Sequence, residues 1–147
     1  MFGSYVMRQD GYGDSGTVSM NEAYDRFMEG QSLLAQANAH AAVVALERAR
    51  DLEPEQGSIR EALARAYFRT GRFSDAEDEF TKAVEIDPVN DYAHFGLGLC
   101  RLRAGDRDRA RGHLKLATIM RPESENYRDA LARVTEPDDV VSGQPQE

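Results

Sequence analysis

The sequence predicts an all-α fold made of three antiparallel helix pairs followed by a single closing helix. Three observations lead to this prediction. Residue types recur at intervals of 34, prolines follow the predicted helix pairs at the same interval, and capping residues separate the apolar segments. An interval of this length is typical of stacked helical repeats, in which each unit is a helix–turn–helix. Because such a unit cannot bury its apolar side alone, neighbouring units are expected to stack.

Five independent series of residues carry the interval in one register. Proline lacks a backbone N–H and clashes with the preceding turn, so each proline is expected just after the end of a helix. Small residues let two helices approach closely, and larger apolar residues are expected to fill the space between successive pairs. The series are Pro54, Pro88 and Pro122; Ala42, Ala76 and Ala110; Ala49, Ala83 and Ala117; Leu46, Phe80 and Leu114; and Gly30, Ala64 and Gly98.

Capping residues predict where the first four helices begin and end. The capping box Ser19–Glu22 is expected to open the first helix. Asn38 can cap the second, because its side chain accepts a hydrogen bond from a backbone N–H that the helix leaves unpaired. Gly71 is predicted to end the third helix, and a second capping box, Ser74–Glu77, to open the fourth.

The same signals continue to the end of the array. Asn90 is suited to cap the fifth helix, and Gly105 with Asp106 repeats the stop and start before the sixth. Ser124 can cap the last helix, which we expect over about residues 125–134. This gives seven helices, the last of which closes the array.

These residues resemble the tetratricopeptide repeat (TPR) family, whose period is 34. The second repeat carries the family positions Leu63, Ala64, Tyr67, Ala76, Phe80, Ala83 and Pro88. The aromatic first position of the family is instead Arg26, Arg60 and His94 in the three repeats. The resemblance implies a TPR solenoid over residues 19–135. Its parts are repeats at about 23–56, 57–90 and 91–124, a capping helix at 125–135, a flexible segment at 1–18 and a disordered acidic tail at 136–147.

Composition excludes several classes of protein. The chain has 147 residues, a formal net charge of −8 and a single cysteine. The acidic balance argues against nucleic-acid binding, and no apolar run is long enough to span a membrane. One cysteine cannot form an internal disulfide, and no signal peptide is evident, which together favour a cytoplasmic location. The preference for arginine over lysine, with only Lys82 and Lys115, suggests a bacterial source.

No catalytic or cofactor motif is found in the sequence. There is no P-loop, dinucleotide-binding glycine motif, HExxH, CxxC or nucleophile elbow, so we predict no enzyme and no cofactor. Three histidines lie on separate predicted helices and Cys100 lies in an apolar stretch, so a metal site with three or four converging ligands is not expected. The basic third repeat could be a patch for nucleic acid or an acidic partner, or its charges could pair with the second repeat or form a solvated face.

The resemblance implies a concave groove lined by the first helix of each pair, and binding in solenoids usually takes place on that surface. We predict a partner-binding groove that takes an apolar or amphipathic peptide or helix. The alternative is that the curled array covers part of this face, Leu34, Leu99 and Leu102 above all. The predicted groove residues are Tyr24, Phe27, Gln31, Leu34, Arg65, Phe68, Arg69, Tyr92, Phe95, Leu99, Leu102 and Arg103.

One TPR subclass holds the terminal carboxylate of acidic chaperone tails with lysine, asparagine and arginine side chains. The matching positions here are Phe27, Gln31, Ala62, Tyr92 and Gly96, and none of them is basic or asparagine. The resemblance therefore implies an adaptor that does not clamp a terminal carboxylate.

Two further expectations concern self-association and the N-terminal segment. A homodimer could form through the groove or an exposed end of the array. The apolar residues Phe2, Tyr5, Val6, Met7 and Tyr12 are unusual for a disordered segment, so residues 1–18 could instead dock in the groove, in the same chain or in a second copy.

Overall fold

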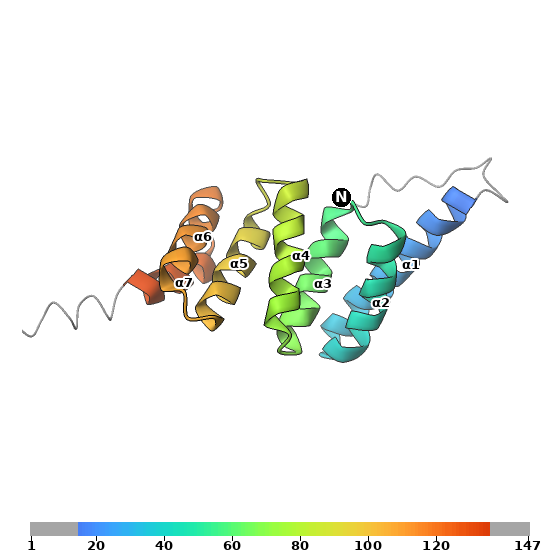
Figure 1. Ribbon diagram of the computed structural model, residues 1–147, viewed down its shortest axis with the longest axis horizontal. Coiled ribbons are helices and arrows are strands. Elements are labelled where there is room, and N and C mark those ends of the chain that lie inside the picture. Colours follow the sequence, from blue (N-terminus) through green and yellow to red (C-terminus); the bar gives the residue numbers. More distant parts are fainter. Residues whose placement is uncertain (1–14, 136–147) are drawn as a thin grey trace, which may run out of the picture. The chain divides into compact units, whose positions relative to one another are not determined.

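The computed structural model describes residues 15–135, and within that range the chain forms seven α-helices and no strands (Figure 1). This confirms the all-α fold of antiparallel helix pairs with a closing helix. The expectations about residues 1–14 and 136–147 lie outside the described residues. The helices are α1 (Ser15–Ala35), α2 (Ala39–Leu52), α3 (Gly57–Arg69), α4 (Phe73–Ile86), α5 (Asp91–Arg103), α6 (Arg107–Met120) and α7 (Glu125–Thr135).

The first compact unit extends to Pro88 and contains the pairs α1–α2 and α3–α4. Within the first pair the helices touch at Gly30, where an added Cβ would lie 2.5 Å from Leu46 Cδ2. Such a distance is far inside van der Waals contact, so only glycine fits there. Ala76 of the second pair is fully buried, as the small-residue series predicts.

The second compact unit begins at Val89 and contains α5, α6 and α7. The same contact recurs in it, because an added Cβ on Gly98 would lie 2.7 Å from Leu114 Cδ2. Leu114 also forms a buried cluster with Ala130 and Val134, which joins α6 to the closing helix. Leu114 therefore packs both within its own pair and against the following helix.

Side-chain caps agree with the prediction at four helix starts. Asn38 Oδ1 accepts a hydrogen bond from Ala41 N, and Asn90 Oδ1 accepts one from Ala93 N. Asp106 caps α6 and Ser124 caps α7 through the backbone N–H groups of the residues three positions later. These caps confirm the predicted starts of α2, α5, α6 and α7.

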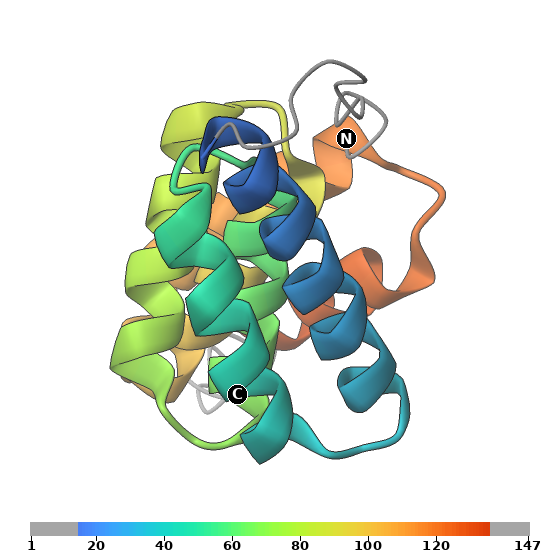
Figure 2. The same cartoon turned by 90° about the vertical axis from the view of Figure 1, so that its right-hand side faces the viewer.

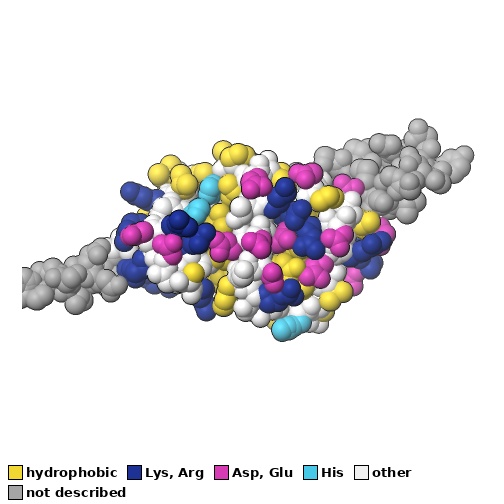
Figure 3. Space-filling view, in the orientation of Figure 1, with side chains coloured by type: hydrophobic (Ala, Val, Ile, Leu, Met, Phe, Trp, Pro, Cys, Tyr) yellow, Lys and Arg dark blue, Asp and Glu magenta, His cyan; other side chains and the backbone are white. Residues whose placement is uncertain are grey.

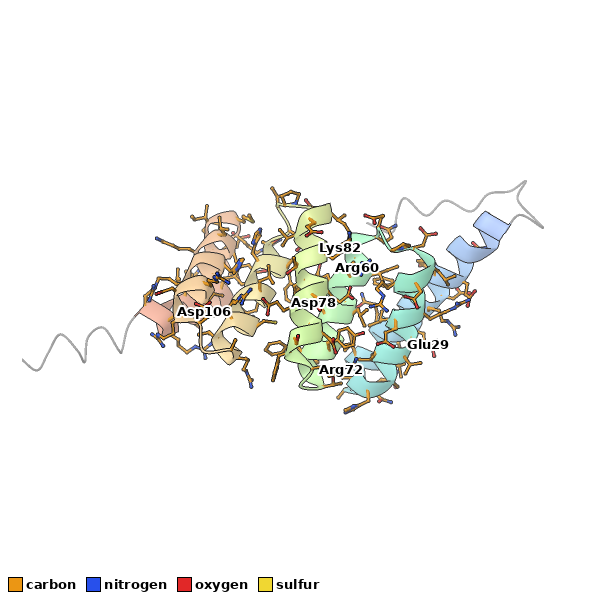
Figure 4. The ribbon with its side chains drawn as sticks, in the orientation of Figure 1. Glu29, Arg60, Arg72, Asp78, Lys82 and Asp106 are labelled. Carbon is orange, nitrogen blue, oxygen red and sulfur yellow. The ribbon has the colours of Figure 1, made fainter. Side chains whose placement is uncertain are left out.

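The two predicted capping boxes are wrong. The first helix begins at Ser15, and its helical backbone runs through Gly16 to Ser19, so Ser19 lies inside the helix and not at its start. The fourth helix begins at Phe73, before Ser74. Phe73 packs edge-to-face against Phe68 with ring centroids 4.9 Å apart. Arg72, which is labelled in Figure 4, lies over the Tyr67 ring. The N-cap position is therefore Arg72, two residues before the predicted Ser74.

A left-handed backbone closes the turn inside each helix pair. Gly71 and Gly105 have φ values of 82° and 83°, as their predicted role at helix ends requires. The residue 34 positions before Gly71 is Ala37, which adopts the same conformation with φ 61°. The first turn therefore carries a side chain where the other two have glycine.

One pair of equivalent positions has different chemistry in each repeat. In the second pair Arg60 donates to Glu79 at 2.8 Å, and Arg60 is labelled in Figure 4. Thirty-four residues later His94 and His113 stack with ring centroids 5.9 Å apart. In the first pair the two positions are Arg26 and Ala45. Helix pairs with the same backbone arrangement thus differ in the side-chain contact between their two helices, which is an ion pair in the second pair and ring stacking in the third.

Candidate functional site: the α1–α3 face

The predicted groove residues of α1 fall on two different faces of the helix. Phe27 and Leu34 are only 7% and 4% exposed, so the prediction that Phe27 contacts a partner is wrong, whereas the burial of Leu34 agrees with the alternative that the array covers it. They belong to the buried stripe of α1, together with Ala23 and Gly30. Spacings of three and four residues connect Phe27 equally well to that stripe and to the exposed one, so the apolar pattern could not distinguish them.

The exposed stripe of α1 lies one residue further along. Tyr24, Met28 and Gln31 follow one another at helical spacing, and both Tyr24 and Met28 are exposed. Sequence reasoning missed Met28, although its position one turn after Tyr24 was a sufficient signal. An exposed tyrosine and methionine on one helix face offer an apolar contact surface to a ligand.

Four of the predicted residues, contributed by the two helices α1 and α3, line a pocket of about 710 Å³. Arg65 Nη2 donates to Gln31 Oε1 at 2.9 Å, and Arg69 Nη1 donates to the Leu34 carbonyl oxygen at 3.2 Å. The two arginines lie one turn apart on α3, so both guanidinium groups reach the same side of α1. The lining, which we call the arginine pocket, is Gln31, Leu34, Ala35, Ala37, Ala39, Arg65 and Arg69.

The charges of the arginine pocket favour an anion. Its lining contains two guanidinium groups and no carboxylate. A guanidinium group can bind a carboxylate through two parallel N–H bonds, and each charge-assisted bond contributes more than a neutral one. The arrangement can therefore hold an acidic side chain of a ligand, and it contains no nucleophile or general base.

The remaining predicted residue of the first unit, Phe68, packs against Phe73 of its own helix pair. It is half-buried and lies at the edge of the α3–α4 contact. Figure 3 shows acidic and basic side chains interspersed with small apolar patches over the face in view. The face of the first unit in this view is therefore mixed. The arginine pocket, with two guanidinium groups, is more polar than the predicted apolar groove.

In the second unit α7 covers part of the predicted groove. Phe95 stacks on Tyr127 with ring centroids 4.7 Å apart, and both Phe95 and Leu102 pack against the cluster around Leu114. Phe95 and Leu102 are therefore half-buried, which agrees for Leu102 with the alternative that the array covers it, and partner contact of their exposed parts stays a prediction. Of the other predicted residues, Tyr92 and Leu99 are half-buried and Arg103 is exposed.

Asp91 anchors the closing helix to α5. It accepts hydrogen bonds from Arg121 Nε at 2.8 Å and from the Tyr127 hydroxyl at 2.7 Å. The hydrogen bond from Arg121 holds the pKa of Asp91 below its ordinary value, although burial acts in the opposite direction. This network keeps Tyr127 in place over Phe95.

Titratable groups outside these sites do not form a metal centre within residues 15–135, because no three of His, Cys, Asp or Glu gather there. The stacked His94–His113 pair has only two potential ligands, and Cys100 is 2% exposed. Among the described helices, none is long and apolar enough to cross a membrane.

Comparison with known proteins agrees with the helix pairing. The family model of the tetratricopeptide repeat matches residues 27–91 and 62–125. The chain is 31% identical over 97 residues to TPR repeat-containing thioredoxin TTL4 of Arabidopsis thaliana, which is 66% of this chain and 14% of that protein. The chain thus spans about a seventh of that relative's length, and the similarity concerns only that part of it.

Two solved structures are similar in fold. The Arabidopsis OM64 TPR domain has a TM-score of 0.76 at 22% identity, and the match covers 79% of this chain and 96% of that one. The first TPR of Spaghetti (RPAP3), bound to the HSP90 peptide SRMEEVD, has a TM-score of 0.75 at 18% identity, covering 83% and 94%. The repeats, the helix pairs and the family model agree, and the chain therefore belongs to the tetratricopeptide repeat family.

Proposed function

We propose that this chain is a non-catalytic adaptor that binds a peptide or helix of another protein along the α1–α3 face, the first part of the predicted concave groove. The observation that carries the proposal is the arginine pocket, in which Arg65 and Arg69 converge without a carboxylate in the lining. The exposed Tyr24 and Met28 on the same face of α1 support an apolar contact beside it. Together they favour an amphipathic ligand.

We propose that a carboxylate group of the ligand determines the specificity of binding. An internal Asp or Glu of the ligand would enter the pocket between Arg65, Arg69 and Gln31, while its apolar side chains lie against Tyr24 and Met28. A hydrogen bond to a charged group contributes about 1.5–3 kcal/mol. One acidic residue is therefore enough to separate good ligands from poor ones. On the second unit, taken by itself, we propose that Tyr92, Leu99 and Arg103 of α5 contact a partner.

Peptide display offers a direct test without a known partner. A library of random 12-residue peptides is selected against the full chain, and the recovered peptides are measured by fluorescence anisotropy. We expect an acidic residue flanked by apolar ones in the selected set. The double variant Arg65→Ala/Arg69→Ala should weaken binding by roughly tenfold or more, as the loss of one charge-assisted bond requires.

The control removes the same charge elsewhere. Arg109→Ala/Lys115→Ala also lowers the net charge by two, but both side chains are exposed on α6 and lie outside the arginine pocket. Equal losses of affinity in the two double variants, or selected peptides without acidic residues, would contradict the proposed site.

Self-assembly is the alternative function, through the groove or an exposed end. This alternative predicts a dimer whose molar mass stays the same on dilution. Sedimentation at two protein concentrations measures that mass. A monomer that binds the selected peptides supports the adaptor. The sequence composition leads us to propose further a cytoplasmic location, a bacterial source and no cofactor.

A further inference from the structure

The first helix pair has an open pocket on the side where the second pair is covered. The pocket lies between α1 and α2 and has a volume of about 580 Å³. Figure 2 views the molecule with these two helices nearest the reader. We call it the edge slot, and its lining is Glu22, Arg26, Glu29, Leu33, Ala41, Val44, Ala45 and Arg48.

The equivalent surface of the second pair shows what such a slot accepts. The residues 34 positions after Leu33 and Ala45 are Tyr67 and Glu79, which occupy the equivalent places in the second pair. There the Tyr67 hydroxyl donates to Glu47 of α2, and Arg50 of α2 donates to Glu79 at 2.8 Å. The occupant is therefore α2, the segment that directly precedes that pair in the chain.

On its α2 side the edge slot is more apolar than its filled counterpart, whereas on its α1 side Glu29 stands where the second pair has Leu63. Ala41, Val44 and Ala45 stand where the second pair has Asp75, Asp78 and Glu79, and Asp78 is labelled on α4 in Figure 4. Val44 is 68% exposed on this surface. A segment that fits here must offer apolar side chains where α2 offers Glu47 and Arg50.

The buried Nε of Arg26 indicates that the slot lacks a hydrogen-bond acceptor. Its counterpart Arg60 donates from Nε to the carbonyl oxygen of Pro54, which lies in the link that precedes α3. Arg26 Nη1 pairs with Glu29 at 3.2 Å, but within residues 15–135 nothing accepts a hydrogen bond from its buried Nε. The missing acceptor corresponds to an oxygen of the segment preceding the pair.

We propose that residues 1–14, which precede α1, occupy the edge slot as α2 occupies the surface of the second pair. Their apolar side chains cover Leu33 and Val44, and a backbone or carboxylate oxygen accepts from Arg26. This differs from docking in the groove, where the arginine pocket with its two guanidinium groups lies. The side chains suited to these contacts are Phe2, Tyr5, Val6, Met7 and Asp10.

The segment is long enough for this path. The helix α1 begins eight residues before Ala23, the equivalent of Gly57, and these residues extend it by about 12 Å. Residues 11–14 can span about 13 Å when extended, so they can return the chain to the slot. Gly11 and Gly13 permit the reversal, because glycine adopts left-handed and extended conformations with little cost. Residues 1–10 then remain for the slot.

Hydrogen exchange of the intact chain tests the contact. We expect amides of residues 2–10 to exchange roughly tenfold or more slowly than in a free peptide of residues 1–14, because bound amides exchange only on local opening. Val44→Asp should abolish this protection. Ile119→Asp is the matched control, since Ile119 is 71% exposed on α6, and it should leave the protection unchanged. Free-peptide rates in the wild type overturn the proposal.

Cross-linking identifies the occupant. In the Val6→Cys/Val44→Cys variant we expect an intramolecular disulfide, seen as a faster-migrating monomer on a non-reducing gel. Native Cys100 is buried and does not compete. A disulfide-linked dimer assigns the slot to a second copy, and equal monomer cross-linking in Val6→Cys/Ile119→Cys shows an unspecific encounter; either result overturns the proposal. Arg65→Ala/Arg69→Ala should leave the specific cross-link intact, so the test is independent of the peptide-binding site.

Discussion

Glu79 on α4 accepts a hydrogen bond from Arg50 on α2 at 2.8 Å, so a buried carboxylate ties the second helix pair to the first. Arg60 of α3 donates to the other oxygen of Glu79 at the same distance. Three helices therefore meet at one side chain. Burial opposes the charge on Arg50, but the hydrogen bond and attraction from Glu79 raise the pKa of that guanidinium above its ordinary value.

The first prediction removes the charge of Glu79. Glu79→Gln keeps the shape but leaves Arg50 and Arg60 without their common anion, so the free energy of unfolding should fall by about 2–4 kcal/mol. Urea unfolding followed by circular dichroism measures the change. The control is Glu85→Gln, whose side chain is largely exposed, and it should cost less than about 0.5 kcal/mol. If both variants lost a similar free energy of unfolding, the proposed role of Glu79 in holding the two helix pairs together would be contradicted.

The second prediction makes one substitution in two places with opposite results. Gly30→Ala places a Cβ against Leu46 and should destabilise the protein by about 1–3 kcal/mol through overpacking. Gly112→Ala on α6 meets no atom within 4 Å, and it should stabilise by about 0.5–1 kcal/mol because alanine favours the helix. Thermal melting of both variants checks the signs. A stabilising Gly30→Ala would refute the close helix contact.

The third prediction concerns the left-handed turn at Ala37. Ala37→Gly removes the clash that a side chain meets at positive φ, and we expect a gain in stability of up to about 1 kcal/mol. Gly71→Ala, the reverse change at the equivalent position, should cost about 1–2 kcal/mol. The midpoints of urea unfolding give both values. Opposite signs are required, and a loss in Ala37→Gly would show that the turn is not strained.

The fourth prediction is a pH dependence in the second unit. Burial first, and then the positive charges of His94, Arg101 and Arg109, lower the pKa of His113. The folded state thus binds fewer protons than the unfolded one below the ordinary histidine pKa of about 6.5, so stability is present above that pH and is lost as the pH falls below it. The free energy of unfolding at pH 7.5, 6.5 and 5.5 measures the slope.

His113→Gln should flatten that slope. His40→Gln, at an exposed position of the first unit, should leave it as in the wild type. If both variants kept the full slope, the acid sensitivity would have to come from other groups.

The fifth prediction addresses the terminal carboxylate of a peptide ligand. Because Phe27, Gln31, Ala62, Tyr92 and Gly96 supply no basic group, the peptide SRMEEVD and its C-terminal amide should bind with affinities within about twofold, a difference under 0.5 kcal/mol. Isothermal titration calorimetry compares the two peptides. A tenfold preference for the free carboxylate would show a terminal clamp that these positions do not predict.

The helix pairs could be predicted because their signals are local and repeated. Asn38, Asn90, Asp106 and Ser124 cap their helices through hydrogen bonds within three residues, and the sequence alone contains both partners. The start of α4 could not be predicted in this way. It depends on the contact of Phe73 with Phe68, which competes with the capping pattern that follows it.

The candidate site was only partly predictable, for a geometric reason. Phe27 and Leu34 satisfy the helical spacing of both the buried and the exposed stripe of α1, and only the position of the neighbouring helices decides between them. The sequence likewise contains no sign that Tyr127 would stack on Phe95. Gln31, Arg65 and Arg69 could be assigned to one face because the 34-residue interval aligns α3 with α1.

The burial of Cys100 has a consequence for measuring the two units separately. It is the only thiol of the chain and lies on α5, so a thiol reagent reaches it only when that helix opens. Its modification rate under native conditions then reports the opening free energy of the second unit. The first unit contains no cysteine, so it does not react with the thiol reagent. Cys100 is therefore an intrinsic probe of opening in the second unit, and no label has to be introduced.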